Sequence, residues 1–198
     1  CALPIYLATA IGELLGARGS HTPDLIRVER CREALATALQ GEAIACRERF
    51  ATSSDLRDIN LAIFNRQASL GTTVPGTIDF AERQVDLALD LRARHAIDPS
   101  DKPSLDLAIG MVTAAQKLLL SEDSIATHAA SGSRQRPAAF RATDALADLL
   151  GERFEDRSDP LDLDRAIEVA TVAHNLASGD REATAAADNR LEIGRAHV

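Results

Sequence analysis

Aromatic residues are scarce in this chain. It has one Tyr, five Phe and no Trp among 198 residues, so aromatics make up 3%. Because β-sheets favour aromatic and β-branched residues, this scarcity argues against a β-rich core. Ala and Leu dominate instead, and both are strong helix formers. The composition therefore predicts an all-α protein.

Basic charge and long apolar runs are lacking as well. The formal net charge is −8, with 22 Lys and Arg against 30 Asp and Glu. Nucleic-acid binding needs a basic stripe and anionic membranes attract basic segments, so we expect neither partner. No run of about 18 apolar residues exists, so we expect no transmembrane helix. The hydrophobic content of 45% still indicates a globular chain.

Cysteine is also rare, with only Cys1, Cys31 and Cys46. They form no CxxC motif and have no matching pair of His residues, so we expect neither a disulfide framework nor a zinc site. Reduced thiols are typical of the cytoplasm, which is the expected location. We expect no cofactor and no metal.

Both ends of the chain match a translated DNA adapter. The tail 193–198 can be written ATC GGA AGA GCA CAC GTC, which is part of a widely used short-read sequencing adapter. The head 1–5 can be written as the reverse complement of the same adapter. Because such scars are excluded from fold reasoning, we treat residues 1–5 and 193–198 as adapter-encoded and 6–192 as an internal fragment.

A short pattern recurs four times between these ends. It consists of an apolar residue, two variable positions, then Ala-Ile, and apolar residues at i, i+3 and i+4 form one face of a helix. We expect the Ala to let a neighbouring helix approach closely and the Ile to pack between the two helices. The pairs are Ala10-Ile11, Ala62-Ile63, Ala108-Ile109 and Ala166-Ile167.

A second anchor precedes three of these copies, and we expect it to pack with them. It is an Arg followed by Phe50, His95 or Phe154. The separations are 13 residues from Arg49 to Ala62, 14 from Arg94 to Ala108 and 13 from Arg153 to Ala166. Ser, Asp and Pro lie between the two anchors, and these residues end one helix and cap the next. Each repeat is therefore predicted to contain helix, short turn and helix.

The expected architecture is a stack of helical hairpins, an α-solenoid of tetratricopeptide-like type. The long helix at 23–50 is expected to break near Gly41. The repeat units are placed at 6–50, 51–96, 97–155 and 156–192. Helices are expected at 6–17, 23–50, 56–70, 77–96, 102–120, 137–155, 161–177 and 181–192, with a helical turn near 125–128 in the long connection between the fifth and sixth.

One stretch resembles a known repeat family. The segment LADLLGERFEDRSDPLDLDRAIEVATVAH is similar to the tetratricopeptide-like repeats that precede CHAT domains, which are caspase-like peptidase domains. The matching residues are Leu150-Gly151, Arg153-Phe154, Asp159, Asp162-Leu163 and Ala166-Ile167. The peptidase His and Cys of that family lie in the CHAT domain itself. No position here matches them, so the resemblance implies no catalytic residue.

Other clusters have simpler explanations. Asp156, Asp159, Asp162 and Asp164 lack the Gly and closing Glu of a calcium loop, so we interpret them as a capped turn. The arginines Arg134, Arg136 and Arg141 could bind an acidic partner, or they could simply lie on a solvent-exposed helix face.

The predicted function is that of a non-enzymatic scaffold that binds a protein or peptide partner, as the sensor or interaction arm of a larger CHAT-type protein. One alternative is a structural repeat region of a signalling ATPase or other enzyme whose catalytic domain lies elsewhere. A closed all-α bundle is another. We also expect self-association through the apolar faces of the end helices, 6–17 and 181–192.

Overall fold

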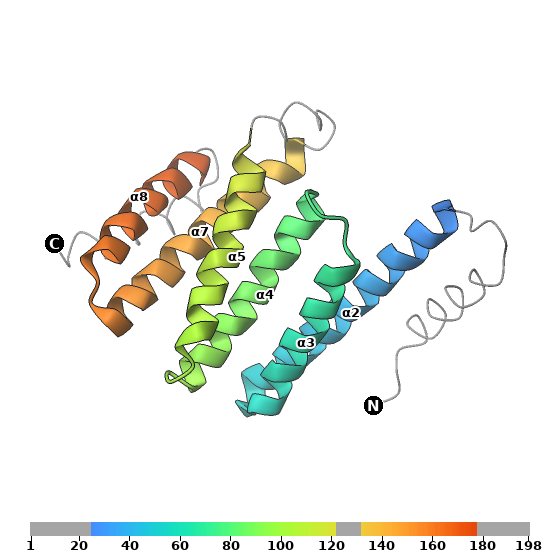
Figure 1. The fold of residues 1–198 in the computed structure, drawn as a ribbon, viewed down its shortest axis with the longest axis horizontal. Helices are drawn as coiled ribbons and strands as arrows, with labels where there is room; N and C mark the ends of the chain where they lie inside the picture. Colours follow the sequence, from blue (N-terminus) through green and yellow to red (C-terminus); the bar gives the residue numbers. More distant parts are fainter. Residues whose placement is uncertain (1–24, 122–131, 178–198) are drawn as a thin grey trace. The chain divides into compact units, whose positions relative to one another are not determined.

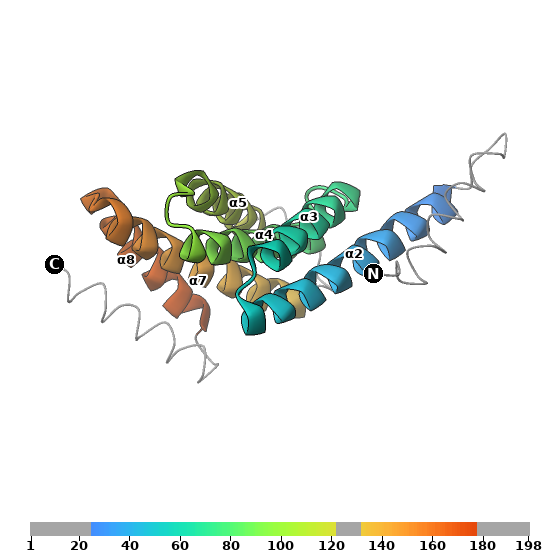
Figure 2. The ribbon, with the colours of Figure 1, turned by 90° about the horizontal axis from the view of Figure 1, so that it is seen from below.

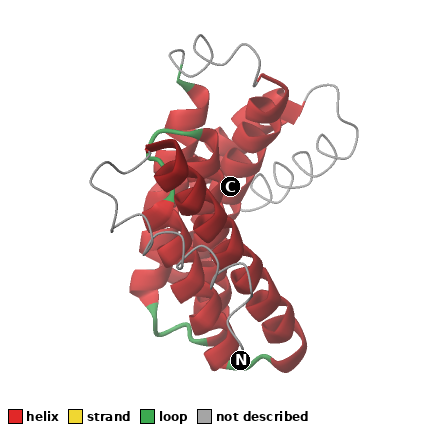
Figure 3. Cartoon of the chain, turned by 90° about the vertical axis from the view of Figure 1, so that its right-hand side faces the viewer, coloured by secondary structure: helices red, strands yellow, loops and turns green. Residues whose placement is uncertain are grey.

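The computed structural model describes residues 25–121 and 132–177. Within these residues every regular element is an α-helix (Figures 1 and 3), which confirms the all-α prediction. The chain divides into two compact units, 1–75 and 76–198. The predicted segments at 6–17, 125–128 and 181–192, with Ala10, Ile11 and both adapter-like ends, lie outside the described residues.

The first compact unit contains one described hairpin. Helix α2 spans Leu25–Ser53 and helix α3 spans Leu56–Thr72, and the two lie side by side (Figures 1 and 2). They run antiparallel, because Ser69 Oγ donates a 2.8 Å hydrogen bond to the carbonyl of Ala36 near one end, and Arg49 contacts Asp58 at the other. The predicted break at Gly41 is wrong, since α2 is continuous through it.

The second compact unit contains two described hairpins. They are α4 (Ile78–Ile97) with α5 (Lys102–Leu120), and α7 (Gly132–Arg157) with α8 (Pro160–Ala177). Helix α7 packs on both helices of the preceding hairpin, α4 and α5. The stacking of one hairpin on the next is the arrangement expected of a solenoid.

The predicted start of α7 at residue 137 is wrong, because the helix begins at Gly132. Pro137 stands at the predicted boundary, and a Pro, which has no N–H, is favoured at the start of a helix. The extra turn is held by tertiary contacts instead. Arg134 pairs with two carboxylates of α4, and Gln135 Nε2 donates a 2.8 Å hydrogen bond to the carbonyl of Leu119.

The helix starts follow from local sequence. Asp55 Oδ1 accepts a 2.8 Å hydrogen bond from the backbone N–H of Arg57, and Asp159 Oδ1 accepts one of 3.0 Å from that of Leu161. Thr77 caps α4 by accepting from the N–H of Phe80. These side chains satisfy donors that a helix N-terminus leaves unpaired.

Candidate interaction surfaces

In the first and last described hairpins, an ion pair explains the 13-residue spacing of the two sequence anchors. Arg49 Nε lies 3.0 Å from Asp58 Oδ1, and Arg153 Nε lies 2.8 Å from Asp162 Oδ2. Each Asp precedes the motif Ala by four residues, so the Arg at the end of one helix reaches the first turn of the next. We call this contact the clasp. Sequence reasoning identified the Arg but not its partner.

The middle hairpin, α4/α5, closes its turn differently. Arg94 Nε lies 2.8 Å from Asp101 Oδ2, and Arg94 also donates to Ser104, which occupies the position of the clasp Asp. This turn is one residue longer. In the shorter turns Ser54 and Ser158 each adopt φ of 54°, a left-handed conformation. The one extra residue between Arg94 and Ala108 thus removes the need for a left-handed residue in the middle turn.

The predicted packing residues in the described part of the chain lie on buried faces, with two exceptions. Ile167 and Phe154 are only half-buried. His95 is 8% exposed, and its Nδ1 lies 3.2 Å from the carbonyl oxygen of Asp101. A His at the Phe position therefore has a backbone partner at the turn. The buried members are Phe50, Ala62, Ile63, His95, Ala108, Ile109 and Ala166.

The first helices of the two hairpins in the second compact unit, α4 and α7, share a charged face. Arg134 Nη2 lies 2.8 Å from Asp79 Oδ1 and 2.7 Å from Glu82 Oε2, and Arg141 pairs with Asp86. Because these partners are separated by a nearly constant 52 to 55 residues, α4 and α7 run parallel.

Further along the same face the basic residue lies on α4 and the acidic residues lie on α7. Arg92 of α4 donates to Glu152 and Asp148 of α7, and the pKa of Arg92 is raised by these carboxylates against the opposing effect of its burial. The arginines Arg134 and Arg141 are thus held by carboxylates of the same chain, and Arg136 Nε donates to the carbonyl of Leu176. This arrangement differs from arginines displayed for an acidic partner.

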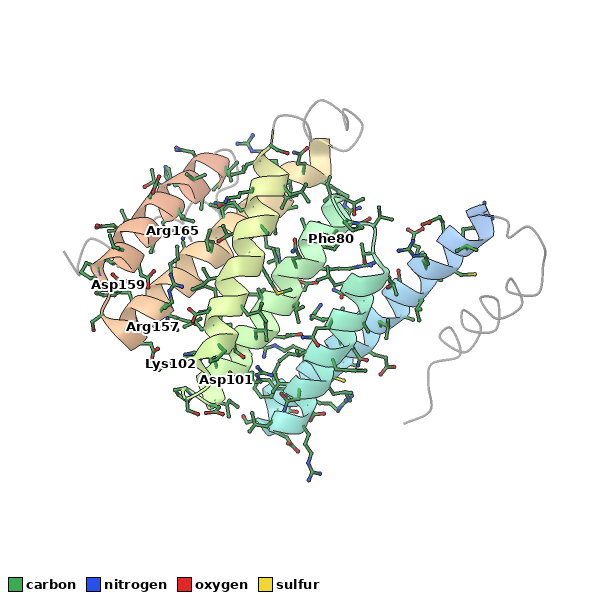
Figure 4. The ribbon with its side chains drawn as sticks, viewed as in Figure 1. Phe80, Asp101, Lys102, Arg157, Asp159 and Arg165 are labelled. Carbon is green, nitrogen blue, oxygen red and sulfur yellow. The ribbon has the colours of Figure 1, made fainter. Side chains whose placement is uncertain are left out.

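A second group of charged residues lies around the turn between α4 and α5 and the end of α7. Asp101, Lys102 and Arg157 lie there (Figure 4). Lys102 Nζ lies 3.5 Å from Asp156, and Arg157 Nη2 lies 2.9 Å from Asp106. The hydrogen bond from Arg157, assisted by Arg153, lowers the pKa of Asp106.

These contacts give structural roles to three of the four aspartates that were considered as a cation cluster. Asp156 pairs with Lys102, Asp159 caps α8, and Asp162 accepts the clasp Arg. Across the described residues no three His, Cys, Asp or Glu side chains gather where they could hold a metal ion. Cys31 and Cys46 are both buried and unbridged.

Helix α2 carries an open pocket of about 700 Å³ on one face. We call this surface the α2 face. Its described lining comes from one stripe of the helix: Arg30, Glu33, Ala34, Thr37, Ala38, Gly41 and Glu42. Sequence reasoning missed it, because the same spacing of small residues also suits a fully covered helix.

Helix α3 displays apolar side chains on its outer side. Leu61 is 43% exposed and Phe64, one turn later, is 64% exposed. Leu107 holds the position of Leu61 in α5 and is 49% exposed, whereas Arg165 holds it in α8. The position directly before the motif Ala therefore faces outward in all three hairpins.

Comparisons with known proteins identify no family. No protein-family model matches the chain, and no curated protein matches it in sequence. Among solved structures, a de novo designed helical repeat protein, DHR64, is 16% identical with a TM-score of 0.44, covering 85% of this chain and 95% of that one. The DHF79 filament is 19% identical with a TM-score of 0.42, covering 82% and 86%. Neither likeness carries an argument about function.

The fold and surfaces together describe a helical-repeat scaffold. In the part of the chain described here, no helix is both long and apolar enough to cross a membrane.

Proposed function

We propose that the chain is a non-catalytic helical-repeat scaffold that binds a protein or peptide partner, as the interaction arm of a CHAT-type protein. The observation that carries the binding role is the exposed pair Leu61 and Phe64 on α3. Large apolar side chains displayed together are typical of interaction sites, and aromatic anchors dominate many interfaces. The pair can bind apolar side chains of a partner segment lying across the helix.

The hairpins differ at this outward position, and the difference supplies selectivity. It is Leu61 in α3, Leu107 in α5 and Arg165 in α8. A partner segment that lies on α3 would meet an apolar side chain at this position, whereas one that lies on α8 would meet a cation. A sequence of matching chemistry would be preferred, because a misplaced apolar or acidic residue loses its contact.

A displayed library of random peptides, selected against the full chain, tests the binding role. We expect selected peptides to bind saturably, and Phe64→Ser to weaken them at least tenfold in fluorescence anisotropy, in line with loss of an aromatic anchor. Leu161→Ser is the matched control, because Leu161 is 73% exposed on another hairpin. Failure to select any peptide, or equal affinity for both variants, would contradict the proposed site.

The CHAT-type parent rests on the sequence resemblance around Arg153-Phe154 and Ala166-Ile167. Reading the source DNA on both sides of the encoding segment tests it. An in-frame caspase-like domain with its own His and Cys supports the proposal. An in-frame ATPase or DNA-binding domain refutes the CHAT assignment and leaves the scaffold role standing.

A further inference from the structure

The first and last described hairpins share one register. The residues Arg49, Ser54 and Asp58 of the first recur 104 positions later as Arg153, Ser158 and Asp162, with the same clasp and the same left-handed turn. Since α2 and α7 are both unbroken helices leading into these turns, the register extends back along them. Each position on α2 therefore has a counterpart on α7.

Four residues of the α2 face, Ala34, Ala38, Gly41 and Glu42, have counterparts on α7 that are buried. Ala34 is exposed where Ala138 is buried, and Gly41 is exposed where Ala145 is buried. Ala38 is half-buried, while its counterpart Ala142 has no exposed surface. The same helical positions are thus covered in one hairpin and open in the other.

The cover on α7 is known. It consists of the α4/α5 hairpin, with α5 making the larger contact and α4 adding the carboxylates. Arg30 on α2 corresponds to Arg134 on α7, whose guanidinium binds Asp79 and Glu82 of α4. Arg30 is exposed beside the pocket.

We propose that the α2 face is a docking surface for a helical hairpin of the α4/α5 kind, whose first helix runs parallel to α2 and presents two carboxylates, three residues apart, to Arg30. The small residues Ala34, Ala38 and Gly41 allow the close approach that their counterparts allow on α7. This inference does not use the exposed pair Leu61 and Phe64, so it does not depend on the α3 site proposed above.

Charge excludes a second copy of this chain as the natural occupant. Counted back from the clasp Arg, the positions of Asp79 and Glu82 are occupied by Ala138 and Arg141 on α7, and by Ala34 and Thr37 on α2. Among the described first helices, α4 alone carries the carboxylate pair, and its pair is already bound to Arg134. A second copy would place Arg141 rather than carboxylates near Arg30.

One position distinguishes the expected partner from α4/α5 itself. Glu42 is half-buried on α2 where α7 has Leu146, which is completely buried. A carboxylate covered by an apolar helix is unfavourable unless it is paired. The partner is therefore expected to carry a basic residue opposite Glu42.

A labelled synthetic peptide of residues 76–121, added to the full chain, tests the proposal. We expect saturable binding in fluorescence anisotropy, with slower hydrogen exchange of the backbone amides at 30–42. Arg30→Glu should weaken binding at least tenfold, and a peptide carrying Asp79→Lys and Glu82→Lys should restore it. Glu42→Leu should tighten binding. Arg32→Glu is the control, because it makes the same charge change on α2 outside the pocket lining.

A second measurement covers the case in which the free peptide does not fold. The same segment is fused ahead of the full chain through a flexible Gly/Ser linker, which raises its effective concentration to the millimolar range. Protection at 30–42 that Arg30→Glu removes supports the proposal. Absence of protection in the fusion, or peptide binding that is insensitive to Arg30, overturns it. Self-association of the unfused chain that Arg30→Glu abolishes would also overturn it, since a second copy would then be the occupant.

Discussion

The clasp between α7 and α8 should contribute more to stability than its counterpart between α2 and α3. The Asp162 side chain is 8% exposed and that of Arg153 is 20% exposed, whereas those of Asp58 and Arg49 are 22% and 49% exposed. Arg153→Met leaves a buried carboxylate without its cation. Hydrogen bonds to charged groups are each worth about 1.5–3 kcal/mol, so we expect a loss of about 2–3 kcal/mol in the free energy of unfolding.

Urea unfolding followed by circular dichroism at 222 nm measures this loss. With a slope of about 2 kcal/mol per molar urea, the midpoint should fall by about 1 M. Arg49→Met is the matched control and should shift its transition less, because water screens the more exposed pair.

A double-mutant cycle with Asp162→Asn isolates the pair itself. The double variant should be more stable than the sum of the two single losses implies, since removing both charges leaves no buried carboxylate alone. Equal shifts for Arg153→Met and Arg49→Met, or strictly additive losses in the cycle, would refute the reasoning.

Three further changes test other parts of the fold. Ser158→Gly should raise the free energy of unfolding by about 1 kcal/mol in thermal unfolding, because φ of 54° strains a residue with a Cβ. The control Ser100→Gly in the middle turn should bring no gain, because Ser100 does not have a positive φ. Gly110→Ala should also stabilise by about 1 kcal/mol, since an added Cβ meets no atom within 4 Å and Gly weakens a helix interior; a loss would show that α5 is covered there. Arg157 lowers the pKa of Asp106 in the folded state. The ionised Asp106 carboxylate therefore stabilises the fold at pH values above the pKa of Asp106 in the unfolded chain. This contribution disappears as the pH falls through the lower pKa of the folded state. Arg157→Gln should therefore raise the pKa of Asp106 in an NMR titration, and an unchanged pKa would rule out the contact.

Local features of the chain were predictable from sequence. Composition and the Ala-Ile motif indicated helices, and Ser, Asp and Pro between the anchors located the turns, because capping and turn formation depend on residues close in the chain. The 13-residue spacing of Arg153 and Ala166 is likewise a local property, since the clasp joins a helix end to the first turn of the next helix.

Other features were decided only by tertiary structure. The early start of α7 depends on contacts of Arg134 and Gln135 with another hairpin, which no local pattern reveals. The same holds for the surfaces. Ala34 and Ala138 occupy one register position and have one residue type, yet one is exposed and the other buried. Whether a helix face becomes core or binding surface depends on what packs against it, and sequence at that position carries no record of the neighbour.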